Sequence, residues 1–363
     1  MHHPHLSHVS RPAHHRPAVW AFGLGAFSVQ FDSFALNLAL PSIGADLGMA
    51  ADRLPAAVAA YLLACGAAMV PGGGAGDRVG HRRVLLAGLT AFAAGSVLCA
   101  LAADPAGLIA FRALQGLGGG LVMPSGLALI ARTAPAGRAA RATGRALGAA
   151  GLATAAGPVA GGALTSLAGW PWVFWAVVPL AAAAAGAALA VREPSPDPRP
   201  TRRPPGTRPI RVLRAAAPAA ALGAAANAAT VVWLFTGPLA LQRAWGLDAA
   251  AAGLVFAAPA LAVAAGGPLA GRAAARPLPV LTALTGTGAG LLATLGALPS
   301  VPLVAAALTA CGLVLGTANA LALIAVQQAA PPDAAGLASG AAKTAVTAAG
   351  GLAMVAVSAA MAG

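Results

Sequence analysis

The sequence predicts an all-α membrane protein with about eleven transmembrane helices in two bundles. The 363 residues are 59% hydrophobic and only 9% charged, with a mean hydropathy of +0.79, whereas a soluble domain carries about 25% charged residues. The apolar runs are about as long as the ~20 residues that a helix needs to cross a bilayer. They are too long for strands, and they lack the two-residue alternation of a membrane barrel.

Charges, prolines and polar clusters separate the expected spans. In chain order the spans cover approximately residues 18–40, 54–74, 83–103, 105–131, 142–167, 171–191, 215–241, 249–270, 278–298, 302–327 and 335–361.

The distribution of charge predicts the orientation of these spans. The net charge of +13 would by itself suggest a nucleic-acid partner. However, 18 of the 22 cationic residues fall in connections on one side of the membrane, while the alternating connections hold Arg53, Arg243 and several aspartates. Cytoplasmic loops are enriched in Lys and Arg. We therefore expect a cytoplasmic N-terminus, the lipid bilayer as a partner, and no nucleic acid.

The predicted spans and loops divide the chain into four segments. Residues 1–17 are His-rich and expected to be disordered and cytoplasmic, and residues 18–191 form a bundle of six helices. Residues 192–214 hold seven Pro and seven Arg, so we expect a cytoplasmic linker that is not helical throughout. Residues 215–363 form a second bundle of about five helices. The three cysteines lie in apolar runs with no disulfide or metal-ligand spacing, and we expect neither a metal nor a cofactor.

Three charged residues lie well within the spans: Asp32, Arg112 and Lys343. A charge at the bilayer centre costs ~2.5–3.5 kcal/mol, so each suggests a functional site. Asp32 lies about 21 Å from the cytoplasmic end of its span and Arg112 about 10 Å from the outer end of its own. An ion pair at one depth is therefore allowed, either as a proton site in which Arg112 tunes Asp32 or as a fixed structural pair. For Lys343 we expect snorkelling to the inner interface rather than a coupling role.

Two further groups of residues have a pattern that suggests movement or close packing. A charged turn joins the second and third spans and contains Gly73, Asp77, Arg78, Gly80, Arg82 and Arg83. In the fifth span, small residues spaced by four allow tight helix packing, and a proline bends the helix; the residues are Ala153, Gly157, Pro158, Gly161 and Gly162.

Four motifs in chain order resemble the major facilitator superfamily, and more narrowly its drug:proton antiporter branch. They are residues 31–41 (FDSFALNLALP), 73–83 (GGAGDRVGHRR), 111–116 (FRALQG) and 157–162 (GPVAGG). The clear match covers roughly residues 18–180. Departures include Ala153 for a glycine, Val177 for an asparagine, and Lys343 where the family offers a small polar residue.

The resemblance implies a monomeric plasma-membrane transporter that works by alternating access and exports small amphipathic or cationic organic compounds in exchange for protons. Asp32 and Arg112 would couple the proton, and Phe31, Phe34, Asn37 and Gln115 would line the substrate cavity. The charged turn and the glycine–proline bend would govern closure. The family has twelve or fourteen spans, so the final helix is expected to be missing.

Other functions stay open. A metabolite exporter or importer on the same fold is one alternative, and a non-transporting membrane scaffold or sensor is another. An enzyme is not expected, because no span carries a catalytic constellation. The glycine-rich stretches lack the Lys-Ser/Thr of a P-loop, which disfavours nucleotide binding.

Overall fold

The protein, examined as a computed structural model, is described over residues 15–135, 139–193, 209–273, 276–294, 300–329 and 335–362, and this part of the chain is helical with no strand. The helices are α1 (His15–Asp46), the short η1 (Ala51–Arg53), α2 (Leu54–Val79), α3 (His81–Ala100), α4 (Pro105–Thr133), α5 (Ala139–Ala168), α6 (Pro171–Leu189), α7 (Pro209–Arg243), α8 (Ala249–Ala273), α9 (Pro277–Thr294), α10 (Val301–Ala329) and α11 (Ala335–Ala362).

Each expected span corresponds to one of these helices, and two starting points were wrong. α1 begins at His15, within the segment expected to be disordered, and α7 begins at Pro209, within the expected linker. Proline is well suited to the first turn of a helix, where its missing N–H has no partner to lose. Residues 1–14 and 194–208 of those two segments lie outside the described residues.

Length and hydropathy allow nine of the described helices to cross a membrane, and a tenth span is formed by the two parts of α5. These parts, Arg145–Thr154 and Ala156–Ala168, meet at an angle of 42°. The bend lies just before Pro158, whose ring removes the hydrogen bond to the Thr154 carbonyl. The remaining helix, α9, is 18 residues long and contains several threonines and glycines.

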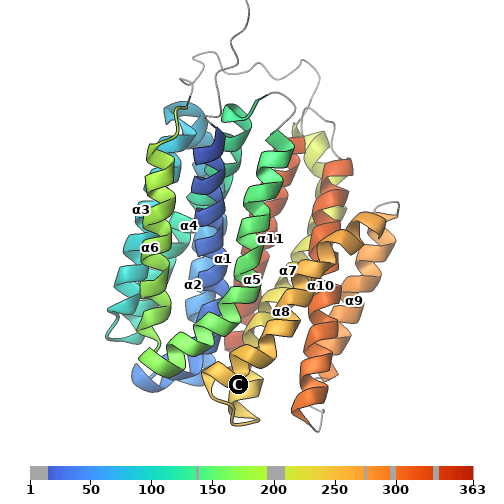
Figure 1. Cartoon of the computed structure of the whole chain (residues 1–363). Coiled ribbons are helices and arrows are strands. Elements are labelled where there is room, and N and C mark those ends of the chain that lie inside the picture. The colour runs from blue at the N-terminus through green and yellow to red at the C-terminus, as the bar shows by residue number, and fades with distance from the viewer. Residues whose placement is uncertain are drawn as a thin grey trace, which may run out of the picture.

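The helices form two bundles (Figure 1). In the first, α1 packs against α4, α5 and α6, and α3 and α4 pack against each other. In the second, α10 contacts α7, α8, α9 and α11, and α11 contacts α7. The principal contacts between the bundles are α2 with α11 and α5 with α8. Substrate and ion sites of such two-bundle membrane proteins lie at the interface between the bundles.

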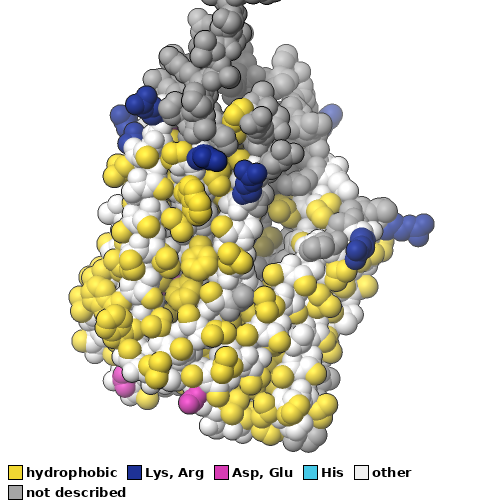
Figure 2. Space-filling model, in the orientation of Figure 1, with side chains coloured by type: hydrophobic (Ala, Val, Ile, Leu, Met, Phe, Trp, Pro, Cys, Tyr) yellow, Lys and Arg dark blue, Asp and Glu magenta, His cyan; other side chains and the backbone are white. Residues whose placement is uncertain are grey.

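The two ends of the molecule differ in the charged side chains that they carry. On the face drawn in Figure 2, Lys and Arg side chains lie towards one end and Asp and Glu at the other, with hydrophobic side chains covering the belt between them. The arginine-rich end holds the start of α1 with Arg16 and the end of α4 with Arg132, and the acidic end holds Asp46 and Asp104. Such a belt is the surface that a bilayer requires.

The bundles are joined in the acidic half of the molecule. There, Gln242 Nε2 donates to the Leu38 carbonyl at 3.1 Å, and the Ala250 N–H donates to Ser166 Oγ at 3.0 Å. The hydrophobic clusters of this half combine both bundles: Phe34 of α1 and Trp233 of α7, for example, belong to one cluster. In the arginine-rich half, each cluster of described residues belongs to one bundle alone.

Small residues on α5 set its distance from two neighbours. A Cβ added at Gly157 would lie 2.5 Å from Phe34 Cβ, and one added at Gly161 would lie 2.5 Å from Ala35 Cα, both on α1. A Cβ at Gly162 would strike the Ala249 carbonyl of α8. The glycines therefore let α5 pack tightly against α1 and across the bundle interface.

Substituting leucine at Gly161 should destabilise this packing, because the new side chain overlaps the backbone of α1. We expect a loss of about 1–3 kcal/mol in the free energy of unfolding, measured from thermal unfolding of the detergent-solubilised protein. Gly151→Leu is the matched control, since a Cβ at Gly151 of the same helix has no atom within 4 Å. Equal unfolding midpoints for the two variants would contradict the packing role.

Candidate functional site

A buried cluster of charged and polar side chains lies in the first bundle. Arg112 Nη1 on α4 donates to Asp32 Oδ2 on α1 at 2.6 Å, and also to Gln115 Oε1. Gln115 Nε2 donates to Asp32 Oδ1 at 2.9 Å and to Ser96 Oγ of α3 at 2.7 Å. Asp32 and Gln115 are 0% exposed and Arg112 is 1% exposed. Both carboxylate oxygens of Asp32 thus have a donor, as a buried charge requires.

The local helix geometry explains how the cluster forms. Arg112 and Gln115 are three residues apart, so they lie on one face of α4. Gly95 of α3 lets α4 approach closely, since a Cβ there would lie 2.7 Å from Gln115 Cα. On the other side, the Arg112 guanidinium lies 4.3 Å from the centre of the Tyr61 ring of α2. This cation–π contact further stabilises the charge.

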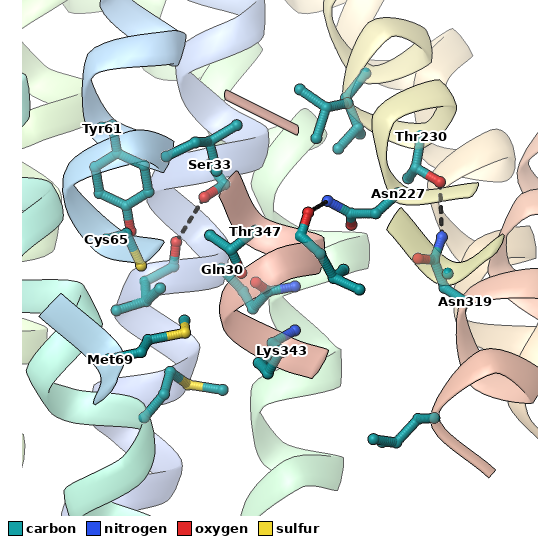
Figure 3. Close-up of a pocket in the computed structure, with 18 of the residues that line it drawn as sticks. Gln30, Ser33, Tyr61, Cys65, Met69, Asn227, Thr230, Asn319, Lys343 and Thr347 are labelled. Atoms are coloured by element: carbon teal, nitrogen blue, oxygen red, sulfur yellow. Dashed lines mark hydrogen bonds between the residues drawn. The ribbon is translucent and has the colours of Figure 1, made fainter. Parts of the chain in front are cut away.

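A cavity of about 330 Å³ lies between the two bundles. It is lined by residues of α1, α2, α4, α7, α8, α10 and α11, most of them apolar. Figure 3 shows its polar side chains, among them Gln30, Asn227, Asn319, Lys343 and Thr347. The lining extends to Met69 and Ala219, towards the arginine-rich half where the hydrophobic clusters of the two bundles are separate. A largely apolar cavity with a few polar groups is typical of small-molecule sites.

Two of the four residues predicted to line the cavity do so, and two do not. Phe34 and Asn37 line it, and Asn37 Oδ1 is buried with no hydrogen-bond partner among the described residues. Phe31 and Gln115 do not line it: Phe31 packs against Phe27 with ring centres 6.0 Å apart, and Gln115 lies in the buried cluster. The lining face of α1 holds Gln30, Phe34 and Asn37, which are spaced by three or four residues. Phe31 directly follows Gln30, so it is turned about 100° from it around the helix.

The structure turns Lys343 towards the space between the bundles, where its side chain is exposed, and its snorkelling to the inner interface stays a prediction. Its side chain lines the cavity between the bundles instead of the outer surface of α11. Residue spacing gives the depth of a residue in a span, but not the direction in which a helix turns its faces.

The charged turn between α2 and α3 is fastened to the end of α6. Gly80 joins the two helices with a φ of 97°, a conformation that favours glycine. The Glu193 carboxylate accepts from the N–H groups of His81 and Arg82, at 3.0 and 2.8 Å. It therefore caps α3 with negative charge at the positive end of the helix dipole.

Side chains of this turn have different surroundings. Arg82 donates to the Ala188 and Leu189 carbonyls of α6, at 3.1 and 2.8 Å. The Asp77 side chain is 76% exposed and pairs with His81 Nε2 at 3.2 Å. Gly73 is partly buried, whereas Arg78 and Arg83 are exposed at the arginine-rich end. The turn is therefore anchored through Arg82 and the start of α3, with its other charges accessible.

Three contributors were missed from the sequence: Tyr61, Ser96 and Glu193. The amino-acid composition could have drawn attention to two of them, because Tyr61 is the only tyrosine in the sequence and Glu193 is the only glutamate. Ser96 carries no such signal, and only its hydrogen bond to Gln115 identifies it.

Comparisons with known proteins agree with this architecture. A sequence profile of the Major Facilitator Superfamily matches residues 22–354. The chain is 38% identical over 175 residues to the tetracenomycin C resistance and export protein of Streptomyces glaucescens, covering 48% of this chain and 32% of that protein. It is 32% identical over 157 residues to the riboflavin transporter RibZ of Clostridioides difficile, covering 43% of this chain and 34% of that protein.

Each match spans about a third of the relative's own length. Among solved structures, a bacterial homolog of the human lysosomal transporter Spinster, in an inward-facing and unoccupied conformation, has a TM-score of 0.71. That likeness has 17% sequence identity and covers 95% of this chain and 82% of the other. At this identity it supports the fold.

A double-mutant cycle on Asp32 and Arg112 should reveal strong coupling. Asp32→Asn leaves a buried arginine without its counter-charge, and such a break costs about 3–5 kcal/mol. In Asp32→Asn/Arg112→Gln no charge is left unpaired. We therefore expect the sum of the stability losses in the two single variants to exceed the loss in the double variant by about 1–3 kcal/mol. Unfolding free energies measured in one detergent give all four corners of the cycle, and additive losses would contradict the pairing.

Glu193→Gln should loosen the turn between α2 and α3. The amide offers one acceptor oxygen in place of two and loses the charge, so we expect a loss of about 1–2 kcal/mol in unfolding free energy. Arg83→Gln serves as a control on the same helix end, because Arg83 is exposed and makes one long contact of 3.4 Å to Val79 O. Unchanged stability in Glu193→Gln would show that the cap contributes little.

Proposed function

The chain belongs to the major facilitator superfamily, and we propose that it exports small amphipathic organic compounds across the cell membrane in exchange for protons. The observation that carries this proposal is the buried Asp32–Arg112–Gln115 cluster beside the cavity between the bundles. In this proposal, the arginine-rich end faces the cytoplasm, as the positive-inside rule favours.

Asp32 suits the proton-carrying role because its charge is reversible and that of Arg112 is not. Taking up a proton would weaken the pairing with Arg112 and free the guanidinium to move. Tyr61 and Arg112 both line the cavity, whereas Asp32 does not. Movement of these two side chains would therefore open a route between Asp32 and water in the cavity. The chemistry resembles other ionisable groups in membranes, which mark proton pathways.

The separation of the two bundles supports alternating access. The bundles are joined in the acidic half and have separate hydrophobic clusters in the arginine-rich half. This arrangement is that of a transporter open towards the arginine-rich side. Rocking of one bundle against the other would reverse it. We propose that the α5 bend at Pro158 and the turn at residues 73–83 control this motion.

The cavity and one relative suggest the kind of substrate. A mostly apolar lining with amide and hydroxyl groups fits a compound with an apolar frame and a few polar substituents. The Streptomyces relative is a resistance and export protein for tetracenomycin C. The resemblance also suggested cationic compounds, but Lys343 lines the cavity and would repel them.

Import on the same fold and a non-transporting role remain the alternatives, and transport by reconstituted protein separates them. Accumulation of a probe that requires protons to flow in the opposite direction supports antiport. Accumulation of the probe in the same direction as the proton flow supports import. Binding without translocation supports a scaffold or sensor.

Asp32→Asn should abolish proton-driven transport and retain proton-independent exchange. We expect tetracenomycin C uptake into inside-out proteoliposomes, driven by an acidic lumen, to fall about tenfold or more because the proton site is gone. Counterflow of the same compound at equal pH should persist, since the cavity does not include Asp32.

Retained counterflow also serves as the folding control for this variant. Equal gradient-driven uptake by wild type and Asp32→Asn would overturn the coupling role. Loss of both activities would be examined with Asp32→Glu, which keeps the carboxylate. Failure of that variant to restore gradient-driven uptake would count against proton exchange at this position.

A further inference from the structure

We propose that Lys343 forms an anion subsite in the cavity, so that the preferred substrate is an amphipathic compound carrying one acidic group. This inference rests on the proposed transport function and specifies its substrate class. The acidic group would be a carboxylate, sulfonate or acidic phenol, with Lys343 Nζ as its donor and counter-charge.

The first observation is the position of Lys343. It lies on α11, the helix through which the second bundle contacts α2 of the first. α2 and α11 are in close contact just beyond it, where a Cβ at Gly66 would lie 3.3 Å from the Ala348 backbone nitrogen. Figure 3 shows the Lys343 amine pointing into the cavity, which Gln30, Met69 and Thr347 also line. The ammonium thus lies at the junction of the bundles, where a bound molecule would contact both.

The second observation is that the charge of Lys343 has no partner. Within the described part of the chain, no hydrogen bond or ion pair involves its amine, and no acidic residue lines the cavity. Asp32 cannot serve, because both of its oxygens are taken by Arg112 and Gln115. The Asp32–Arg112 pair is neutral as a unit, so the cavity keeps one uncompensated positive charge.

The third observation is compositional. Lys343 is the only lysine among the 22 cationic residues of the chain, and the other 21 are arginines. Nearly all of those arginines lie outside the spans, where they orient the protein. An unpaired charge within a span is costly and is kept where it has a function. A lysine presents a compact point charge with three donors, which suits an acidic group that must bind and then leave.

The rest of the cavity specifies the remainder of such a substrate. Asn227 donates to the Val346 carbonyl at 2.9 Å, and Asn319 donates to Thr230 Oγ1 at 2.8 Å. Their amide oxygens are neutral acceptors that cannot neutralise the lysine. The apolar side chains of Leu234, Val263 and their neighbours favour an aromatic or aliphatic frame. A compound with an acidic group on an apolar frame can pair with the lysine and also contact the apolar side chains of the cavity.

Equilibrium binding of three matched probes tests the subsite. The full-length protein in lipid nanodiscs is titrated, at one neutral pH, with 2-naphthoate, 2-naphthamide and 2-naphthylmethylammonium. These share a ring system and differ in charge. We expect 2-naphthoate to bind about tenfold or more tightly than the amide, because hydrogen bonds to charged groups are the stronger ones, and the ammonium to bind most weakly.

Three variants identify Lys343 as the cause. Lys343→Met, similar in length and uncharged, should remove the preference for 2-naphthoate, and Lys343→Arg should retain it. Arg243→Met removes the same unit of charge from an exposed position at the acidic end and should leave the preference unchanged. Unchanged binding of the amide by Lys343→Met would show that the variant is folded.

Two results would overturn the proposal: equal affinity of the wild type for the anion and the amide, or an anion preference that survives in Lys343→Met. Absence of any 2-naphthoate binding would also count against it. Because no proton gradient is present, loss of proton coupling in Asp32→Asn leaves this experiment unaffected. The failure of the substrate class and the failure of the antiport function are therefore distinguishable.

Discussion

The ion pair between Asp32 and Arg112 is the constraint on which the first bundle depends. A charge in a medium of low dielectric is stable only if it is paired and hydrogen-bonded. This requirement fixes α1 against α4, and Gln115 extends it to Ser96 of α3. The Tyr61 ring closes the cluster on the side of α2. Four helices are thereby positioned around one pair of charges, each contributing a group that the others cannot replace.

Small residues make that pairing geometrically attainable. Gly116 and Gly120 of α4 stand where a Cβ would strike the Tyr61 and Cys65 carbonyls of α2, and Gly161 does the same for α1 against α5. Membrane helices gain no hydrophobic free energy from associating in lipid, so close packing and polar contacts must hold them together. The glycines supply the first and the buried cluster supplies the second. Across the bundle interface, by contrast, the contacts are concentrated in the acidic half.

Two charges with different surroundings, those of Arg112 and Lys343, therefore line the same cavity from different bundles. Arg112 is fully paired and belongs to the first bundle, whereas Lys343 is unpaired and belongs to the second. A proton on Asp32 would leave the Arg112 charge without its counter-charge, and a bound anion would neutralise the Lys343 charge. Because the two charges lie on different bundles, each event would change the electrostatic interaction between the bundles. This gives a physical link between binding and rearrangement that needs no direct contact between substrate and Asp32.

The sequence by itself determined the class of fold, the eleven long helices of the described residues, the charge asymmetry of the two ends and the three charges within the spans. These properties follow from hydropathy, length and the cost of burying charge, all of which are local. The sequence also placed Asp32 and Arg112 at one depth, because depth is residue number multiplied by a fixed rise. Only the tertiary structure decided which helix faces meet. It placed Gln115 in the charged cluster, Phe31 away from the cavity and Lys343 within it, because the rotation of each helix is set by packing against its neighbours.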